Sequence, residues 1–322
     1  RKSLWNINIC KEIRNMRKIT VAILLLAAMR VSAQESAGES AALPFLNQIR
    51  SAVSAGSAGV MMKPDAYAHF GNVADAVYGE EKMAAGVSYS LWQPDVTHAN
   101  IFSVSASYKL NDRMAVTAGA STSLYRKDWK YDELGIKTAE MHPVDVLAGA
   151  GFAYRIIDGL SAGAALNYVM SKNIAGTANA FAADVQVAFR RNGLDLSVAA
   201  CNLGMQVKDE AGAGYQLPMN ARLNAGYGFG FGKSRLYGAL QGRYYFGGPS
   251  AVAGGVALEY EWNGMLSVRA GMSEGQKKNG VPSCAAAGVS LKLGGICIDL
   301  AYSAMASGPM KNTLACGIGY SF

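Results

Sequence analysis

The residues that could do acid–base or nucleophilic chemistry are few and far apart in this chain. Its three histidines, His69, His98 and His142, fall in different segments. A serine nucleophile needs its base within hydrogen-bond reach, and no local Ser/His/Asp grouping surrounds any of the three. Their spacing also lacks a zinc-ligand pattern. We therefore predict no enzymatic activity, no metal and no cofactor, the alternative being distant residues that meet in space.

Adjacent carboxylates and a glycine-rich run are the other candidates for chemistry. Glu80-Glu81, Asp132-Glu133 and Asp209-Glu210 lie at an element edge or in loops, where no pocket is expected to separate their pKa values. We predict solvated positions for them, although Asp132-Glu133 could bind a cation. The run GYGFGFG at Gly226–Gly232 lacks the helix that follows a phosphate-binding loop. It fits a strand that ends in a hairpin.

The elements that carry these residues are shown by the alternation at the end of the chain. The last ten residues read TLACGIGYSF, and every second one is apolar or aromatic while the others are small or polar. Only 16% of all residues are charged, which is low for a soluble domain, where about 25% is typical. The alternation therefore predicts that these last residues form a strand with one apolar face.

The same alternation predicts fourteen strands, most of about ten residues, the length that crosses a bilayer when tilted. Tight turns such as Asn111–Arg113 and Ile157–Gly159 suit hairpins, and they alternate with mostly longer loops. Short turns at one end and longer loops at the other are the rule for outer-membrane barrels. The predicted strands are Met83–Trp92, Ile101–Leu110, Met114–Leu124, Val144–Ile156, Leu160–Val169, Asn179–Phe189, Leu194–Leu203, Asn220–Phe229, Ser234–Phe246, Ala251–Trp262, Met265–Met272, Val281–Leu293, Ile296–Met305 and Thr313–Phe322.

Strands in hydrocarbon must close into a barrel, because every backbone amide needs a partner there. We therefore predict an all-β fold, a 14-stranded antiparallel transmembrane β-barrel over residues 83–322. Apolar side chains face outer-membrane lipid, small or polar ones face the lumen, and both termini are periplasmic with Tyr320 and Phe322 at that interface. The alternative is a soluble β-protein rich in alanine and glycine.

Residues 1–33 are predicted to be upstream residues and a secretory signal peptide. Arg17 and Lys18 precede the apolar run Ile19–Met29, and Val31–Ala33 offers small residues at a cleavage site. Without this segment the net charge falls from +7 to about +1, which argues against a nucleic-acid partner. The later cysteines are predicted to be small packing residues rather than disulfide partners; they are Cys201, Cys284, Cys297 and Cys316.

Residues 34–82 do not alternate and are predicted to form an N-terminal plug segment. They contain small residues, a proline and a weakly helical run. A fourteen-stranded barrel has a lumen wider than its strand side chains can fill. The economical interpretation is a plug folded inside the lumen, and a flexible periplasmic tail is the alternative.

This region also carries a resemblance to a known family. The stretch RSAVSAGSAGVMMKPDAYAHFGNVADAVYGEEKMAAGVSYSLW (Arg50–Trp92) resembles the opening of the PorV/PorQ family, and it is closer to PorV. These are FadL-like outer-membrane proteins of the Bacteroidetes type IX secretion system. Pro64-Asp65-Ala66 matches one plug motif, and Phe70 to Ala74, with Asn72, matches an aromatic-Asn-Pro-Ala-like motif that here has an inserted Gly71 and Val73 in place of proline. Similar motifs recur at Ser105–Tyr125, Asn179–Arg190 and Leu217–Phe229.

The resemblance implies a non-enzymatic shuttle that binds secreted cargo through its C-terminal secretion domain. Such a shuttle meets cargo at the translocon barrel and delivers it to surface attachment proteins. Aromatic residues at the outer rim are the expected contacts, although an interfacial belt would use the same residue types; they are Trp92, Trp129, Tyr131 and Tyr215. The alternative is a FadL-type transporter of hydrophobic small molecules, with an apolar pocket above the plug and a kinked strand at Gly149/Gly151 or Gly254/Gly255.

Overall fold

The structure is a computed structural model that describes most of the chain. The described residues are 41–94, 98–174, 176–208, 214–248, 250–276, 279, 281–305 and 312–322. The predicted signal peptide, the first residues of the plug segment and Asp209-Glu210 lie outside this part.

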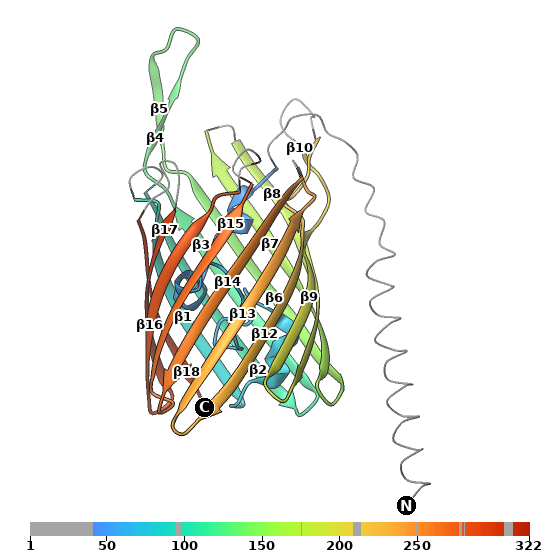
Figure 1. Cartoon of the computed structure of the whole chain (residues 1–322). Coiled ribbons are helices and arrows are strands. Elements are labelled where there is room, and N and C mark those ends of the chain that lie inside the picture. Colours follow the sequence, from blue (N-terminus) through green and yellow to red (C-terminus); the bar gives the residue numbers. More distant parts are fainter. Residues whose placement is uncertain are drawn as a thin grey trace, which may run out of the picture. The chain divides into compact units, whose positions relative to one another are not determined.

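Fourteen strands pair into one closed sheet, as the alternation predicts (Figure 1). All neighbours around the ring are antiparallel, and β1 (Met83–Trp92) closes it by pairing with β18 (Thr313–Ser321). The other strands of the ring are β2 (Ala99–Asn111), β3 (Met114–Leu124), β6 (Val144–Ile157), β7 (Leu160–Asn173), β8 (Gly176–Arg191), β9 (Leu194–Leu203), β12 (Asn220–Phe231), β13 (Ser234–Tyr245), β14 (Ala251–Trp262), β15 (Leu266–Gly275), β16 (Cys284–Leu293) and β17 (Ile296–Met305).

The two faces of the sheet differ as predicted. In β17, Ile298 and Leu300 are exposed on the outside, while Asp299 between them is 2% exposed. In β18, Ile318 and Tyr320 are exposed and Ala315 is buried. An apolar outer surface that continues around a closed sheet is the arrangement that hydrocarbon solvates.

Two short hairpins stand apart from the ring and were not predicted. Strands β4 (Asp128–Tyr131) and β5 (Lys137–Met141) pair with each other in the long loop after β3. This hairpin projects from the end of the barrel opposite the C-terminus (Figure 1). Strands β10 (Val207–Lys208) and β11 (Gly214–Tyr215) form a smaller pair before β12.

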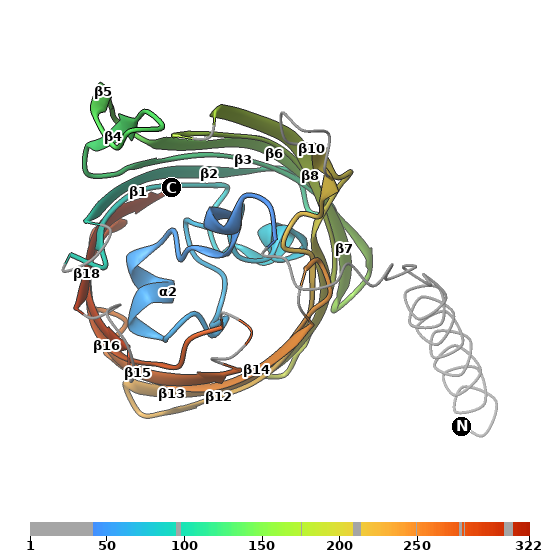
Figure 2. The same cartoon turned by 90° about the horizontal axis from the view of Figure 1, so that it is seen from above.

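The described part of the plug segment, residues 41–82, lies within the ring of strands (Figure 2). It contains η1 (Pro44–Asn47), α2 (Ala52–Gly56) and η2 (Val73–Tyr78). The side chain of Ser51 caps α2 by accepting from the Ser54 amide, and Asn72 caps η2 by accepting from the Ala74 amide. Among the described residues, no helix has both the length and the apolar character to cross a membrane.

Glycines in the wall let the backbone of the plug segment come close. A Cβ at Gly163 in β7 would lie 2.6 Å from the Ala74 amide nitrogen. A Cβ at Gly271 in β15 would lie 2.4 Å from the Ser57 carbonyl oxygen. Both neighbours are backbone atoms, so neither can rotate away. The glycine content of the inward face therefore fits this segment against the wall.

The close approach at Gly163 predicts the effect of a single added methyl group. Gly163→Ala should destabilise the folded protein by about 1–3 kcal/mol, because the Cβ overpacks against the backbone of Ala74. Gly242→Ala is the matched control, since a Cβ at Gly242 in β13 meets nothing within 4 Å. Guanidinium unfolding in detergent micelles measures both. Equal stability of the two variants would contradict the contact.

Candidate functional site

Charged side chains gather on the lumen wall of a chain that is poor in charge. Glu259 of β14 and Arg269 of β15 lie directly opposite each other, and the Arg269 Nε is 3.0 Å from the Glu259 Oε2. Arg269 also donates to Ser290 Oγ at 2.6 Å and lies 3.7 Å from Asp299 Oδ1. Arg269 is 4% exposed, and Glu259 and Asp299 are each 2% exposed. Their opposite charges compensate burial within the wall.

Lys63 brings the plug segment into this charged cluster. Its Nζ lies 2.9 Å from Glu259 Oε1 and also contacts Glu261 Oε2. Burial alone would lower the pKa of Lys63, but the two carboxylates raise it above its usual value. The lysine is therefore a cation that ties residues 41–82 to β14. The sequence alone did not indicate this cluster, although charges at inward positions of strands that are poor in charge were a signal for it.

A second ion pair holds η2 against another part of the wall. Arg190 of β8 binds both oxygens of Asp75, at 3.0 and 3.1 Å, in a bidentate pair. Its Nη1 also donates to Asp195 Oδ2 at 2.9 Å. The Tyr237 hydroxyl donates to the same oxygen of Asp195 at 2.9 Å. Two separate charged contacts thus fix the plug segment inside the barrel.

The predicted motif Pro64-Asp65-Ala66 forms a turn that meets the closing strands. Asp65 Oδ1 accepts from the Tyr67 amide at 2.7 Å, and the Tyr67 hydroxyl donates to the Val87 carbonyl of β1 at 2.8 Å. Burial raises the pKa of Asp65 to about 6, against the effect of the Tyr67 amide. Ala66 lies beside Gly319 of β18. The motif therefore has a positional role at the point of barrel closure.

The second motif lies beside a buried histidine. His69 contacts Thr117 Oγ1 of β3 and Asn167 Oδ1 of β7, both at 3.0 Å. Burial lowers the pKa of His69, although the Asn167 hydrogen bond and the Asp184 charge oppose this. Phe70 packs its edge against the His69 ring, with centroids 5.5 Å apart, and Asn72 caps η2. His69 therefore joins the plug segment to two strands as a neutral side chain.

A cavity of about 100 Å³ lies between the plug segment and the wall. Its polar lining includes three arginines and Asp184, and its apolar lining includes Leu46, Phe70 and Leu147. Arg50 donates to the carbonyls of Phe45, Leu46 and Gln48. Burial lowers the pKa of Arg50 to about 10, so it carries its charge at neutral pH. The cavity lining therefore combines cationic and apolar side chains; the arginines are Arg50, Arg222 and Arg243.

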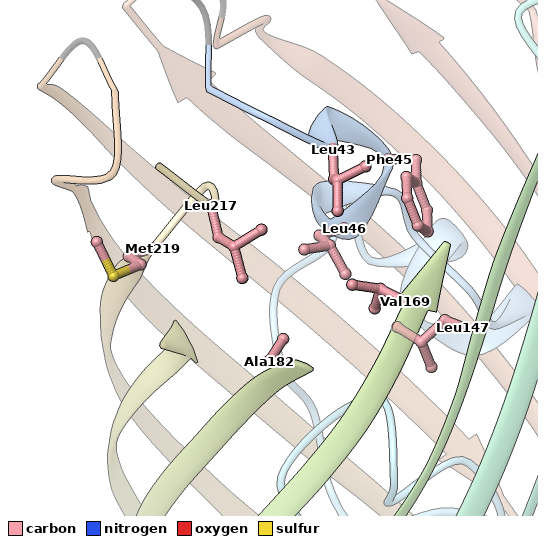
Figure 3. Close-up of a cluster of buried hydrophobic side chains, with 8 residues drawn as sticks. All are labelled: Leu43, Phe45, Leu46, Leu147, Val169, Ala182, Leu217 and Met219. Atoms are coloured by element: carbon pink, nitrogen blue, oxygen red, sulfur yellow. The ribbon is translucent and has the colours of Figure 1, made fainter. Parts of the chain in front are cut away.

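An apolar cluster, drawn in Figure 3, shares residues with the lining of this cavity. Leu46 and Leu147 belong to both, and Phe70 packs against the cluster. The cluster joins η1 to the wall strands and to the segment before β12. Its buried members are Leu43, Phe45, Leu46, Leu147, Val169, Ala182, Leu217 and Met219.

One register shift of the wall lies between β8 and β9, and none lies at the four glycines proposed as kinks. Strands pair in continuous register through Gly149, Gly151, Gly254 and Gly255. The β8–β9 register instead shifts between Ala183 and Val185. Asn202 takes a φ of 58° there, and its amide donates to Asp184 Oδ1 at 2.7 Å. This bulge places Asp184 and Asn202 on the lining of the cavity.

The four predicted rim aromatics belong to three different elements. Trp92 ends β1 and is half-buried, whereas Trp129 and Tyr131 lie on the projecting β4–β5 hairpin. The Trp129 ring has Lys127 Nζ at 5.7 Å and Lys137 Nζ at 4.8 Å from its centroid. Tyr215 lies in β11, paired with Val207. Only Trp129 and Tyr131 therefore share a surface element.

The other candidates for chemistry that the structure describes do not come together in one site. Among the described residues, no group of three or more His, Cys, Asp or Glu could hold a metal ion. Cys201, Cys284, Cys297 and Cys316 are free thiols. His98 and His142 are exposed. His142 follows β5, and its Nε2 lies 3.6 Å from Oε1 of Glu140 in that strand.

Comparison with solved structures identifies the architecture. The Ralstonia pickettii toluene transporter TbuX matches with a TM-score of 0.57 at 14% identity, over 84% of this chain and 98% of that one. A Pseudomonas aeruginosa FadL homologue gives 0.57 at 11% identity, over 84% and 98%. The fold is that of the FadL-like outer-membrane barrels. The CymD monoaromatic hydrocarbon channel gives 0.58 at 12% identity, over 84% and 97%. No protein-family model and no curated protein sequence matches the chain.

The Lys63–Glu259 contact predicts a large effect of removing one buried charge. Glu259→Gln leaves Arg269 and Lys63 without their shared carboxylate, and should destabilise the protein by about 3–5 kcal/mol. Glu140→Gln is the control, because its partner Lys127 is exposed, and should cost about 0–1 kcal/mol. Denaturant unfolding in micelles compares them. A similar small loss in both variants would exclude a structural role for the cluster.

The raised pKa of Asp65 predicts that the stability of the folded protein falls as pH rises. Its pKa is about 6 in the folded protein, above its ordinary value near 3.8, so the folded state holds the proton more tightly between these values. Stability should decline from pH 4 to pH 6 and then level off. Asp65→Asn keeps an acceptor for the Tyr67 amide and should flatten this decline, unlike Asp112→Asn in an exposed turn. Melting temperatures across this pH range test it, and an unchanged decline in Asp65→Asn would refute it.

Proposed function

We propose that this chain is an outer-membrane transporter of hydrophobic small molecules, built on the FadL-like barrel. Structures of the same fold include the toluene transporter TbuX and the monoaromatic hydrocarbon channel CymD. The apolar outer face supports a position in the lipid of the outer membrane. In this proposal the end with the tight turns and Phe322 faces the periplasm.

The observation that carries the proposal is the cavity between the plug segment and the wall. A lumen filled by side chains and plug would carry nothing, whereas this one keeps a space of about 100 Å³ beside a buried apolar cluster. Ligand sites are concave and combine apolar side chains with placed polar groups, and here Leu46, Phe70 and Leu147 form the apolar part of a largely polar lining. The cavity also reaches the β8–β9 bulge through Asp184 and Asn202. Bulges re-aim strands next to functional sites, so this position is the proposed exit.

A second function rests on the projecting hairpin and on the PorV resemblance. In a type IX shuttle, cargo with a C-terminal secretion domain would bind outside the barrel. The hairpin exposes apolar side chains well beyond the ring, with Leu134 84% and Ile136 59% exposed. Tyr131 and the lysine-flanked Trp129 add aromatic contact area. The translocon barrel and surface attachment proteins would then be the further partners.

Uptake of a labelled monoaromatic hydrocarbon tests the transporter. Deleting the gene should lower uptake by intact cells several-fold, and the native gene should restore it. Met61→Trp should restore little, because Met61 lines the cavity and a larger side chain narrows it. Met265→Trp, in the tight turn between β14 and β15 and outside the cavity lining, should restore uptake fully and is the matched control.

The outcome also separates the two functions. Normal uptake in the deletion strain would overturn the transporter. Retention of secreted proteins in the periplasm of that strain, together with their co-purification with the barrel, would support the shuttle instead. Loss of co-purification on removal of residues 129–137 would assign cargo binding to the hairpin.

A further inference from the structure

Two arginines face each other on neighbouring strands of the lumen wall. Arg222 of β12 and Arg243 of β13 are direct cross-strand partners. The Cβ atoms of such cross-strand partners lie only about 4.5–5.5 Å apart, and like charges at these positions are destabilising. Both arginines line the 100 Å³ cavity. A sheet would not gain stability from this pair on its own.

No carboxylate forms an ion pair with either arginine within the described residues. Arg222 donates to Cys201 Sγ, from Nε at 3.2 Å and from Nη2 at 2.7 Å. Arg243 donates from Nη1 to the Tyr245 hydroxyl at 3.0 Å. Neither guanidinium has a carboxylate within 4.0 Å among the described residues, in contrast to Arg269 and Arg190. Arg269 and Arg190 are thus paired with carboxylates, whereas Arg222 and Arg243 line the cavity without one.

Asp184, the acid that also lines the cavity, accepts hydrogen bonds from two neighbours other than these arginines. Asp184 Oδ1 accepts from the Asn202 amide at 2.7 Å, and its Oδ2 accepts from Asn167 Nδ2 at 3.3 Å. Arg50, the third arginine, donates to the carbonyls of Phe45 and Leu46 in η1 and of Gln48 just after it. Arg243 Nε is buried and has no hydrogen-bond partner among the described residues. A buried charged donor without an acceptor is costly, so the site favours an added acceptor.

We propose that this cavity binds one oxyanion, a carboxylate or phosphate group, between Arg222 and Arg243. Two planar guanidinium forks match the paired oxygens of such a group. The cavity volume of about 100 Å³ leaves room for such a group. Leu46, Phe70 and Leu147 would cover any apolar part attached to it. This inference names the ligand chemistry of the proposed transport cavity and rests on that proposal only for its physiological meaning.

Calorimetric titration of the purified full chain in a neutral detergent tests the inference. The probes are inorganic phosphate, acetate and decanoate at low chloride. The folded protein should bind at least one of them, and Arg243→Gln or Arg222→Gln should weaken that binding at least about tenfold. Arg191→Gln, at the exposed end of β8, is the control and should bind as the unmodified protein does. Tighter binding of decanoate than of acetate would assign the anion to an apolar molecule, and equal binding would assign it to a free ion.

Stability separates ligand binding from a structural role. Without added anion, Arg243→Gln should melt at the same temperature as the unmodified protein or higher, because it removes a repulsion. Phosphate, acetate or decanoate, whichever binds, should raise the melting temperature of the unmodified protein and not that of the variant. A lower melting temperature in Arg243→Gln with unchanged binding would overturn the proposal, as would a folded protein that binds no probe. Anion binding without hydrocarbon uptake would instead leave this inference standing and reject the transporter.

Discussion

The pairing of β1 with β18 is the constraint on which the rest of this structure depends. A sheet in hydrocarbon cannot have a free edge, because unpaired backbone groups find no water there. Closing the ring satisfies both edges through eight paired positions from Ala84–Ser321 to Leu91–Leu314. Once the ring is closed, each strand has one face toward lipid and one toward the lumen. The apolar exterior and the small or polar interior follow directly from this geometry.

Closure of the ring also leaves a wide lumen, which the plug segment partly fills. The wall carries alanine, serine and glycine on its inner face, so it cannot fill the lumen alone. Those small residues admit the backbone of residues 41–82 at van der Waals distance, as Gly163 and Gly271 show. Specific charges then hold the segment in place. Lys63 joins Glu259 on one part of the wall, and Asp75 joins Arg190 on another.

The lumen therefore holds two kinds of buried charge, which differ in their electrostatic balance. Around Arg269 the opposite charges are matched, and the result is an anchor. Around Arg222 and Arg243 the charges are alike, and their described partners are a thiol and a hydroxyl. A matched cluster stabilises a structure by itself, whereas an unmatched one gains from a ligand of opposite charge. This difference is the physical basis for placing function in the cavity rather than at the anchor.

The sequence by itself determined the strands, their faces and the closing role of the last strand, because a side-chain period of two is a local property. It also predicted a separate plug segment over residues 34–82, of which the structure describes residues 41–82. It missed the β4–β5 hairpin, since strands of four and five residues in a charged loop show little alternation. It could not bring Lys63 to Glu259, or set Arg222 opposite Arg243, because those contacts depend on strand register and on how the segment lies in the lumen. The tertiary structure alone decided which buried charges are compensated, because compensation is a matter of distance between residues far apart in the chain.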